Sequence, residues 1–253
     1  MGVILIKIGS LFSGIGGFEL GLERAIPGSR TVWQVEQDEF CQRVLRRHWP
    51  ASKLYADVVG VGGNNLEKVD IVCGGFPCQD LSFAGRRKGL DGEKSGLWWE
   101  MWRVVSELRP RVVCVENVAG LFSLGIRAVL GSLADLGYDA EWQVISARQF
   151  GAPHLRKRIF IVAYSTSLDD QKLSINAVKM EQGARVRGSR SRDSRIGRIH
   201  RENHWQKHQR PSGICRVDDG IPNRLDRLRA LGNAVVPQCG KWVGEQIMKS
   251  GLL

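Results

Sequence analysis

Residues 3–25 read VILIKIGSLFSGIGGFELGLERA and join an apolar run to a helical pattern through a glycine-rich loop. The run Val3–Ile8 is typical of a β-strand, and Gly17–Ala25 has the apolar spacing of a helix. Glycines in the loop Ser10–Gly21 allow a tight turn and a close approach of the backbone to a ligand at the helix amino terminus. This order of elements predicts an α/β domain with a ligand site at the loop.

An acid follows the second predicted strand, because Glu36 comes directly after Thr31–Val35. A carboxylate at that position commonly accepts hydrogen bonds from ribose hydroxyls, which indicates a ligand that contains a nucleoside. A structural turn with a surface acid is the alternative interpretation. The loop does not fit an NAD-dependent dehydrogenase, because Glu19 stands where the dinucleotide fingerprint requires a third glycine or an alanine.

Short apolar runs alternate with helical patterns along most of the chain, which predicts a mostly parallel sheet with helices on both faces. The pattern stops between residues 165 and 220, where Ser, Arg, Gly and Gln dominate, and it returns with Asn223–Leu231 and Val236–Met248. Because the strands show little polar alternation, we expect both of their faces to be covered. The other predicted strands are Val69–Cys73, Val112–Val115, Trp142–Ser146 and Ile159–Ala163, and the other predicted helices are Glu39–His48, Gly96–Leu108 and Ile126–Leu136.

The composition is that of a folded protein with a strong positive charge. The chain has 253 residues, of which 43% are hydrophobic, and 37 Lys and Arg against 26 Asp and Glu give a net charge of +11. Residues 181–210 hold nine basic and three acidic residues, so more than half of the net charge lies there. This favours a nucleic-acid partner over the alternative of a solvated basic loop. No run reaches the roughly 18 apolar residues of a membrane span, and the amino terminus lacks signal-peptide features, so we expect a cytoplasmic protein.

Six cysteines are present, and none forms a Cys-x-x-Cys pair. Cys73 and Cys114 lie in apolar runs and are predicted to be buried. Cys78 instead follows Phe76-Pro77 in a turn-forming loop, where the carboxyl end of a parallel strand presents groups to a ligand. Glu116 follows the next strand at the same edge and is either an acid of the site or a cap of the following turn.

Two further clusters favour structural interpretations. His200, His204 and His208 are spaced so that one helix face would carry them, and with Cys215 they could bind zinc. The absence of a cysteine pair makes a basic, phosphate-contacting face the better interpretation, and no metal is predicted. The three tryptophans between residues 98 and 102 are predicted to be core residues rather than a base-stacking platform.

Seven motifs in a fixed order resemble the DNA (cytosine-5)-methyltransferase family, in a prokaryotic or phage form with a short target-recognition region. The resemblance covers about residues 1–163 and 222–253. The motifs are Phe12-Ser13-Gly14-x-Gly16-Gly17, Glu36, Asp57, Pro77-Cys78-Gln79, Glu116-Asn117-Val118, Arg156-Lys157-Arg158 and Gly232-Asn233-Ala234-Val235.

The resemblance implies transfer of a methyl group from S-adenosylmethionine to carbon 5 of cytosine in double-stranded DNA, on a base that is flipped out of the helix. It implies that the Cys78 thiolate adds to carbon 6 of the base and that Glu116 bonds ring nitrogen 3 and the amino group. Arg158 matches an arginine that contacts the base, and Arg156 stands at the neighbouring basic position.

The resemblance also implies a cofactor pocket, in which Phe12 lies against adenine, Glu36 takes the ribose hydroxyls and Asp57 accepts from the adenine amino group. Asn233 belongs to the segment that completes this pocket. The remaining implied cofactor residues are Gly14, Ile15, Gly16, Gly17 and Pro77.

The implied architecture is a Rossmann-like S-adenosylmethionine-dependent methyltransferase fold with one antiparallel strand near its edge, at Trp142–Ser146 or Ile159–Ala163. We expect a catalytic domain over 1–164, a small irregular basic recognition lobe over 165–221 and a closing segment over 222–253, acting as a monomer. The predicted DNA contacts are Ser82, Arg86, Arg87, Lys88, Arg187, Arg190 and Arg192.

Two alternatives stay open at this point. One branch of the family acts on RNA, so a transfer-RNA cytosine methyltransferase on the same fold would also suit the basic lobe. A catalytically weak DNA-binding remnant is the other alternative, because the insertion is short for a domain that reads sequence.

Overall fold

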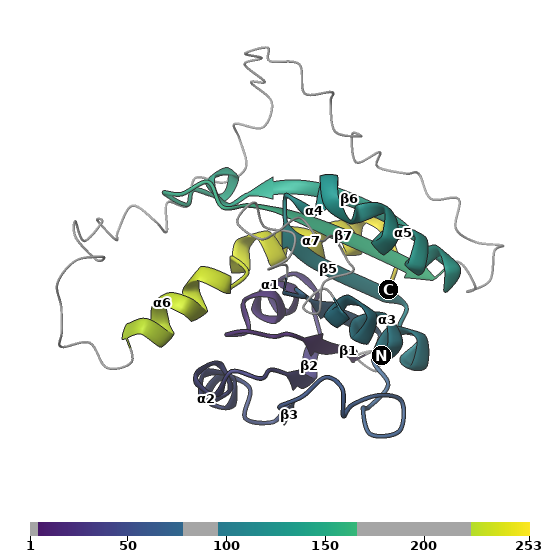
Figure 1. Cartoon of the computed structure of the whole chain (residues 1–253), viewed down its shortest axis with the longest axis horizontal. Coiled ribbons are helices and arrows are strands. Elements are labelled where there is room, and N and C mark those ends of the chain that lie inside the picture. Colours follow the sequence, from purple (N-terminus) through teal and green to yellow (C-terminus); the bar gives the residue numbers. More distant parts are fainter. Residues whose placement is uncertain (1–4, 78–95, 166–223) are drawn as a thin grey trace, which may run out of the picture.

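The computed structural model describes residues 5–77, 96–165 and 224–253. Seven strands form one sheet in the order β3-β2-β1-β4-β5-β7-β6, with helices packed around it (Figure 1). The strands are β1 (Ile6–Leu11), β2 (Ser29–Val35), β3 (Lys53–Tyr55), β4 (Ile71–Gly74), β5 (Val112–Val118), β6 (Tyr138–Ser146) and β7 (Lys157–Ser165).

The first five strands of the sheet are parallel to one another, since β1 pairs with β2 and β4, β2 with β3 and β4 with β5. Strand β7 runs antiparallel to both of its neighbours, β5 and β6. The expected antiparallel strand is therefore the later of the two candidate segments. A mostly parallel sheet with one reversed strand near its edge confirms the Rossmann-like class.

The helices begin and end close to where the sequence predicts them. Helices α1, α2 and α3 have the predicted bounds, and α5 is one residue shorter at its end. Asp38 explains the start of α2, because its side chain accepts a hydrogen bond from the backbone N–H of Cys41. The helices are α1 (Gly17–Ala25), α2 (Glu39–His48), α3 (Gly96–Leu108), α4 (Leu121–Leu124), α5 (Ile126–Asp135), α6 (Arg224–Asn233) and α7 (Pro237–Ser250), and a 3₁₀ turn, η2, spans Ala147–Phe150.

Each face of the sheet has its own apolar core. Alternate residues of one strand serve the two cores, as Val113 faces one and Cys114 the other. The first core packs α3 and α5 against the sheet, and Trp98 and Met101 are fully buried in it. The second packs α1 and α7 against the other face. The predicted burial of Cys73 and Cys114 is confirmed.

Helices α1 and α7 touch so closely that glycine is required between them. A Cβ at Gly21 would lie 2.5 Å from the carbonyl oxygen of Pro237, and one at Gly17 would lie 2.1 Å from that of Val235. The segment that returns after residue 223 is thus held directly against the helix that follows the first glycine loop.

Several predictions about the elements need correction. The first strand lies at Ile6–Leu11 rather than Val3–Ile8, because pairing with β2 and β4 continues to Leu11. Strand β3 was not predicted. The edge strand β6 is not covered on both faces, since its Trp142 and Val144 are each 41% exposed. Among the tryptophans of α3, Trp99 is 44% exposed and is not a core residue.

Candidate active site

The glycine loop after β1 is held in a strained conformation by backbone contacts. Phe12, Gly14 and Gly16 all have positive φ, at 55°, 56° and 81°. The N–H of Ser13 donates to the carbonyl oxygen of Val35 at 3.1 Å. Such a φ is costly for Phe12, which has a side chain, and residues in this conformation gather at ligand sites.

Glu36 ties the loops that follow β1 and β2 together. Its Oε2 accepts from the N–H of Gly14 at 2.7 Å, and its Oε1 accepts from the N–H of Asp38 at 2.8 Å. Each carboxylate oxygen can accept a second hydrogen bond. Glu36 therefore shapes the glycine loop and still has acceptor capacity for a hydroxyl donor.

Gly16 and Gly17 allow close packing and do not line the pocket. A Cβ at Gly16 would lie 2.3 Å from the ring of Trp49, and Gly17 is pressed against Val235. A Cβ at Gly14 would meet no atom of the described residues within 4 Å, so this position faces open space.

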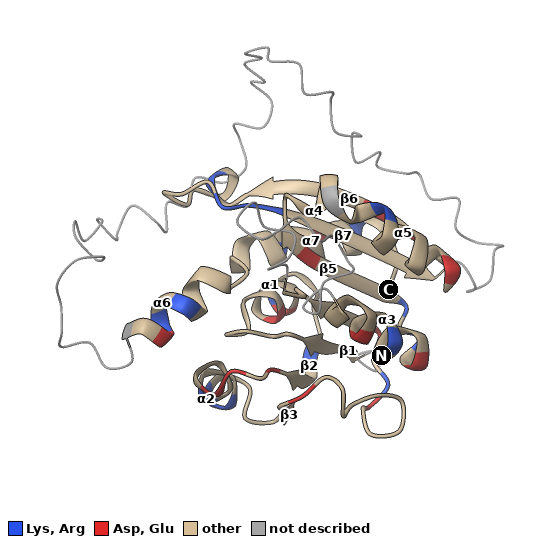
Figure 2. Cartoon of the chain, viewed as in Figure 1, with Lys and Arg blue, Asp and Glu red and all other residues tan. Residues whose placement is uncertain are grey.

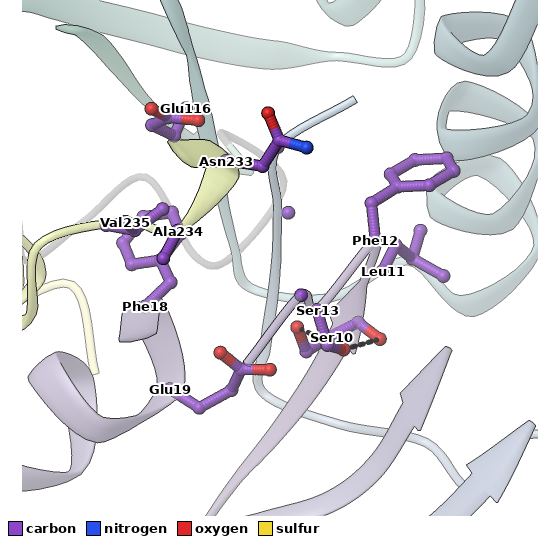
Figure 3. A pocket seen from close by; sticks show the side chains of 13 residues that line it. Ser10, Leu11, Phe12, Ser13, Phe18, Glu19, Glu116, Asn233, Ala234 and Val235 are labelled. Atoms are coloured by element: carbon purple, nitrogen blue, oxygen red, sulfur yellow. Dashed lines mark hydrogen bonds between the residues drawn. The ribbon is translucent and has the colours of Figure 1, made fainter. Parts of the chain in front are cut away.

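A pocket lies where the glycine loop, the end of β4, Glu116 and the Asn233–Val235 segment meet (Figure 3). Of the predicted residues, Phe12, Gly14, Glu116 and Asn233 line it. Ile15, Gly16, Gly17, Glu36, Asp57, Pro77, Arg156 and Arg158 do not belong to its lining. The remaining lining residues, which the sequence did not single out for this role, are Ser10, Leu11, Ser13, Phe18, Glu19, Gly74, Gly75, Ala234 and Val235.

Glu116 is an acidic residue that lines this pocket from β5. It lies in β5 with its side chain only 9% exposed, and its Oε1 is 2.9 Å from Nε of Arg158 in β7. Burial raises the pKa of Glu116 to about 7, although the charges of Arg158 and Arg156 act to lower it. A carboxyl group with such a pKa can hold or give up a proton near neutral pH.

Arg156 makes contacts that the sequence did not predict. Its guanidinium donates from Nη1 to the carbonyl oxygen of Gly232 at 2.8 Å and from Nη2 to that of Ala234. It thereby clamps the residues on either side of Asn233, a pocket residue. Burial and the neighbouring charge of Arg158 lower the pKa of Arg156. In this structure Arg156 fixes the closing segment.

The segment that precedes Cys78 in the sequence passes beside Glu116. A Cβ at Gly75 would lie 2.7 Å from Oε2 of Glu116, and Nδ2 of Asn117 donates to the carbonyl oxygen of Phe76 at 3.1 Å. Pro77 is half-buried and ends the described segment. Cys78 itself lies outside the described residues. The same holds for every predicted DNA contact and for the histidine cluster with Cys215.

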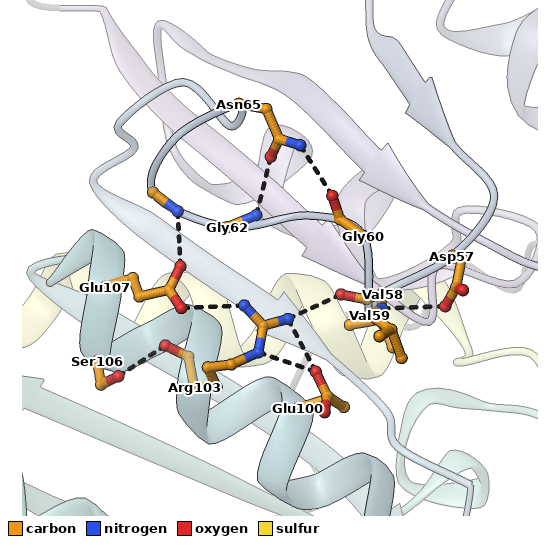
Figure 4. Close-up of polar contacts among 11 residues, drawn as sticks. Asp57, Val58, Val59, Gly60, Gly62, Asn65, Glu100, Arg103, Ser106 and Glu107 are labelled. Atoms are coloured by element: carbon orange, nitrogen blue, oxygen red, sulfur yellow. Dashed lines mark hydrogen bonds and ion pairs between the residues drawn. The ribbon is translucent and has the colours of Figure 1, made fainter.

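Asp57 begins a loop that α3 holds in place (Figure 4). Asp57 is exposed and accepts from the N–H of Val59 at 3.0 Å. Arg103 donates to the carbonyl oxygen of Val58 at 2.9 Å, and it also pairs with Glu100 and Glu107. Glu107 in turn accepts from the N–H of Gly63 at 2.7 Å.

Basic and acidic residues occur together along α2, α3 and α6, as the coloured ribbon shows (Figure 2). The basic run of residues 181–210 lies outside the described residues. In the part of the chain that the structure describes, no group of three or more His, Cys, Asp or Glu could hold a metal ion. None of the described helices is long and apolar enough to cross a membrane.

Comparisons with known proteins agree on one family. A family model described as "C-5 cytosine-specific DNA methylase" matches residues 6–216. The type II methyltransferase M2.BsuMI of Bacillus subtilis is 36% identical over 166 residues, which is 62% of this chain and 42% of that protein. The type II methyltransferase M.HhaI of Haemophilus parahaemolyticus is 32% identical over 165 residues, 64% of this chain and 50% of that protein. The chain thus spans about half the length of these relatives or less.

Solved structures show the same fold. A prophage-encoded DNA modification methyltransferase of E. coli superposes with a TM-score of 0.53 at 28% identity, covering 64% of this chain and 47% of the other. The DNMT2 mutant of Spodoptera frugiperda superposes with a TM-score of 0.55 at 19% identity, covering 64% and 51%, and this likeness concerns the fold alone.

Proposed function

The chain belongs to the C-5 cytosine-specific DNA methylase family, and from this premise we propose that it transfers a methyl group from S-adenosylmethionine to carbon 5 of cytosine in double-stranded DNA. The observation that carries the proposal is the buried Glu116, which is paired with Arg158 and shares a pocket with Phe12 and Asn233. An acid that can hold a proton near neutral pH and that lines the same pocket as Phe12 and Asn233 is what this chemistry requires.

The pocket residues fit S-adenosylmethionine, which supplies an electrophilic methyl group when it is bound. Gly14 leaves room at the loop, because no described atom lies within 4 Å of the position of a Cβ there. The aromatic ring of Phe12 offers a surface for the adenine, and Glu36 retains acceptor capacity beside the same loop. Asn233 faces the pocket from the closing segment. Asp57 is exposed and free to accept from an amino group that reaches it.

Carbon 5 of cytosine is a poor nucleophile, and the chain supplies two groups to change that. The Cys78 thiolate forms a bond to carbon 6, and the electron pair moves so that carbon 5 becomes nucleophilic. Glu116, held by Arg158, bonds ring nitrogen 3 and favours the charge that develops on the ring. Carbon 5 then takes the methyl group from the sulfonium, whose bond to the methyl breaks with its electron pair left on sulfur. A base removes the carbon 5 proton, and the bond between sulfur and carbon 6 breaks.

The DNA side of the proposal rests on charge. The chain carries a net charge of +11, which suits a polyanion. Because the target carbon is stacked within the duplex, the base must leave the helix to reach Glu116. We assign phosphate contacts to Ser82, Arg86, Arg87 and Lys88, and to Arg187, Arg190 and Arg192 of a recognition insertion over 165–221. A monomer and a cytoplasmic location stay predictions.

A methyl-transfer assay tests the proposal. The full chain is incubated with methyl-labelled S-adenosylmethionine and either mixed-sequence duplex DNA or bulk transfer RNA, and the nucleic acid is digested to nucleosides. We expect label in 5-methylcytosine from DNA.

Either of the other outcomes would overturn the proposal. Label from RNA alone would assign the chain to the transfer-RNA branch. No label with cofactor binding intact would favour a DNA-binding remnant.

A further inference from the structure

Glu19 is a buried acid in the pocket to which the proposed reaction gives no part. It lies in the first turn of α1, is 0% exposed and lines the pocket together with Ser10 and Ser13. In the sequence it stood out only as the residue in place of the third glycine of the dinucleotide fingerprint. Its side chain comes from the end of the pocket opposite Glu116 (Figure 3).

Only one of the two carboxylate oxygens of Glu19 has a hydrogen-bond donor among the described residues. Its Oε1 accepts from Nε2 of Gln34 at 3.2 Å, but its Oε2 is buried and has no hydrogen-bond donor among the described residues. A buried oxygen without a donor is costly, more so if it is charged. Burial raises the pKa of Glu19, although the nearby hydroxyls of Ser10 and Ser13 and the amide of Gln34 act to lower it.

The geometry of the pocket indicates what kind of group would satisfy Oε2. Phe12 marks the side that suits an aromatic base, and Glu116 marks the side where methyl transfer must occur. The sulfonium methyl group has to face Glu116, and the adenine has to face Phe12. The amino-acid end of the cofactor is left for the side with Glu19, and that end carries an ammonium group.

We propose that the Glu19 carboxylate binds the α-ammonium group of the amino-acid end of S-adenosylmethionine, an assignment that rests on the proposed function. An ammonium group has three N–H donors, which suit Oε2 and the hydroxyl oxygens of Ser10 and Ser13 at the same end of the pocket. A hydrogen bond between two charged groups is stronger than one between neutral groups. Glu19 would thus select ligands that carry the amino-acid end.

A purely structural role for Glu19 makes a different prediction. Through Gln34 the side chain links α1 to β2. If that link were its only task, removing the charge would disturb the pocket for every ligand alike. The two roles therefore differ in ligand selectivity.

The test uses calorimetric titration of the full chain with three ligands. S-adenosylmethionine and S-adenosylhomocysteine both carry the ammonium group, and 5′-methylthioadenosine has the same nucleoside without the amino-acid end. We expect Glu19→Gln to raise the Kd of the first two by about 10-fold or more, and to leave that of 5′-methylthioadenosine within about 2-fold.

Glu23→Gln is the matched control on the same helix. Glu23 accepts from Thr31 and Trp49 and does not line the pocket. We expect it to leave the ratio of the three Kd values unchanged.

The assignment fails if Glu19→Gln weakens all three ligands equally, weakens none, or weakens S-adenosylmethionine alone. The last result would mean that Glu19 acts on the sulfonium charge. A wild-type chain that binds none of the three ligands would overturn the proposed function instead. Thermal unfolding of each variant shows whether it is folded.

Discussion

Oε1 of Glu116 lies 2.9 Å from Nε of Arg158, across two strands that run in opposite directions. Glu116 pairs with Phe160 and Arg158 pairs with Val118, so the two charged residues are diagonal neighbours on one face of the sheet. Side chains on the same face of neighbouring strands meet in this way only when one register is fixed. The antiparallel strand β7 therefore brings a cation to the buried acid at the pocket.

Replacing Cys78 by alanine tests the covalent step. We expect Cys78→Ala to abolish methylation while S-adenosylmethionine still binds, because the thiolate is proposed to attack carbon 6. A duplex that contains 5-fluorocytosine should trap a denaturation-resistant adduct with the wild-type chain and none with the variant. Turnover by the variant would rule out the covalent mechanism.

Replacing Glu116 by glutamine tests its raised pKa. The folded chain binds this proton more tightly than the unfolded chain, with a pKa of about 7 against 4.5. Protonation of Glu116 therefore stabilises the folded chain fully below pH 4.5, and this stabilisation is lost as the pH rises through 7. The loss amounts to about 3 kcal/mol of unfolding free energy at most. We expect Glu116→Gln to lose methylation and to flatten the fall in stability between pH 5 and pH 8, as measured by urea unfolding.

Glu107→Gln is the control, because the pKa of Glu107 is lowered whereas that of Glu116 is raised. The N–H of Gly63, followed by Arg103, lowers the pKa of Glu107, so its contribution is present at neutral pH and is lost as the pH falls through that lowered value. Its removal should leave the slope between pH 5 and pH 8 as it is in the wild-type chain. An equal change in both variants would contradict the assignment to Glu116.

Replacing Phe12 by alanine tests the adenine surface. Phe12 lines the pocket with a positive φ, and a small side chain would remove the aromatic face without adding a clash. We expect the affinity for S-adenosylmethionine to fall by about 10-fold, since aromatic stacking on a base is worth about 1–3 kcal/mol. DNA binding, measured by fluorescence anisotropy, should change far less. Equal losses in both would argue against stacking.

Replacing Arg156 by glutamine tests the clamp on the closing segment. The two guanidinium bonds to Gly232 and Ala234 would be lost. We expect faster amide hydrogen exchange over residues 232–236 and weaker cofactor binding, because Asn233 would no longer be fixed. Exchange in α3 is the internal reference, since Arg156 does not contact it. Unchanged exchange at 232–236 together with lost methylation would show that Arg156 acts on the base instead.

Neutralising Arg187, Arg190 and Arg192 tests the phosphate contacts. Each phosphate contact contributes about 0.9 to the slope of log affinity against log salt. We expect the triple change to glutamine to reduce that slope by about 2–3, with cofactor binding unaffected. A matched control replaces Arg43, Arg46 and Arg47 of α2, which lie in the described part of the chain. A wild-type slope in the variant at Arg187, Arg190 and Arg192 would place those three arginines away from the DNA.

The sequence alone was sufficient where structure depends on neighbours along the chain. The glycine loop and the apolar spacing of α1 to α3 act over a few residues, so the bounds of these helices could be predicted. The order of strands and helices also predicted the Rossmann-like class. Among the site residues, Phe12, Gly14, Glu116 and Asn233 were predicted from sequence motifs and do line one pocket.

Only the tertiary structure decided what depends on residues far apart in the chain. The first strand was placed too early because its end is set by pairing with β2 and β4. The exposure of Trp142 also depends on which segments pack over its face of β6. The use of Arg156 as a clamp on Gly232 and Ala234 and the burial of Glu19 at the pocket likewise follow from packing. A motif fixes which side chains are available, whereas burial and partner choice are set by the segments that fold against them, and the local sequence carries no record of those segments.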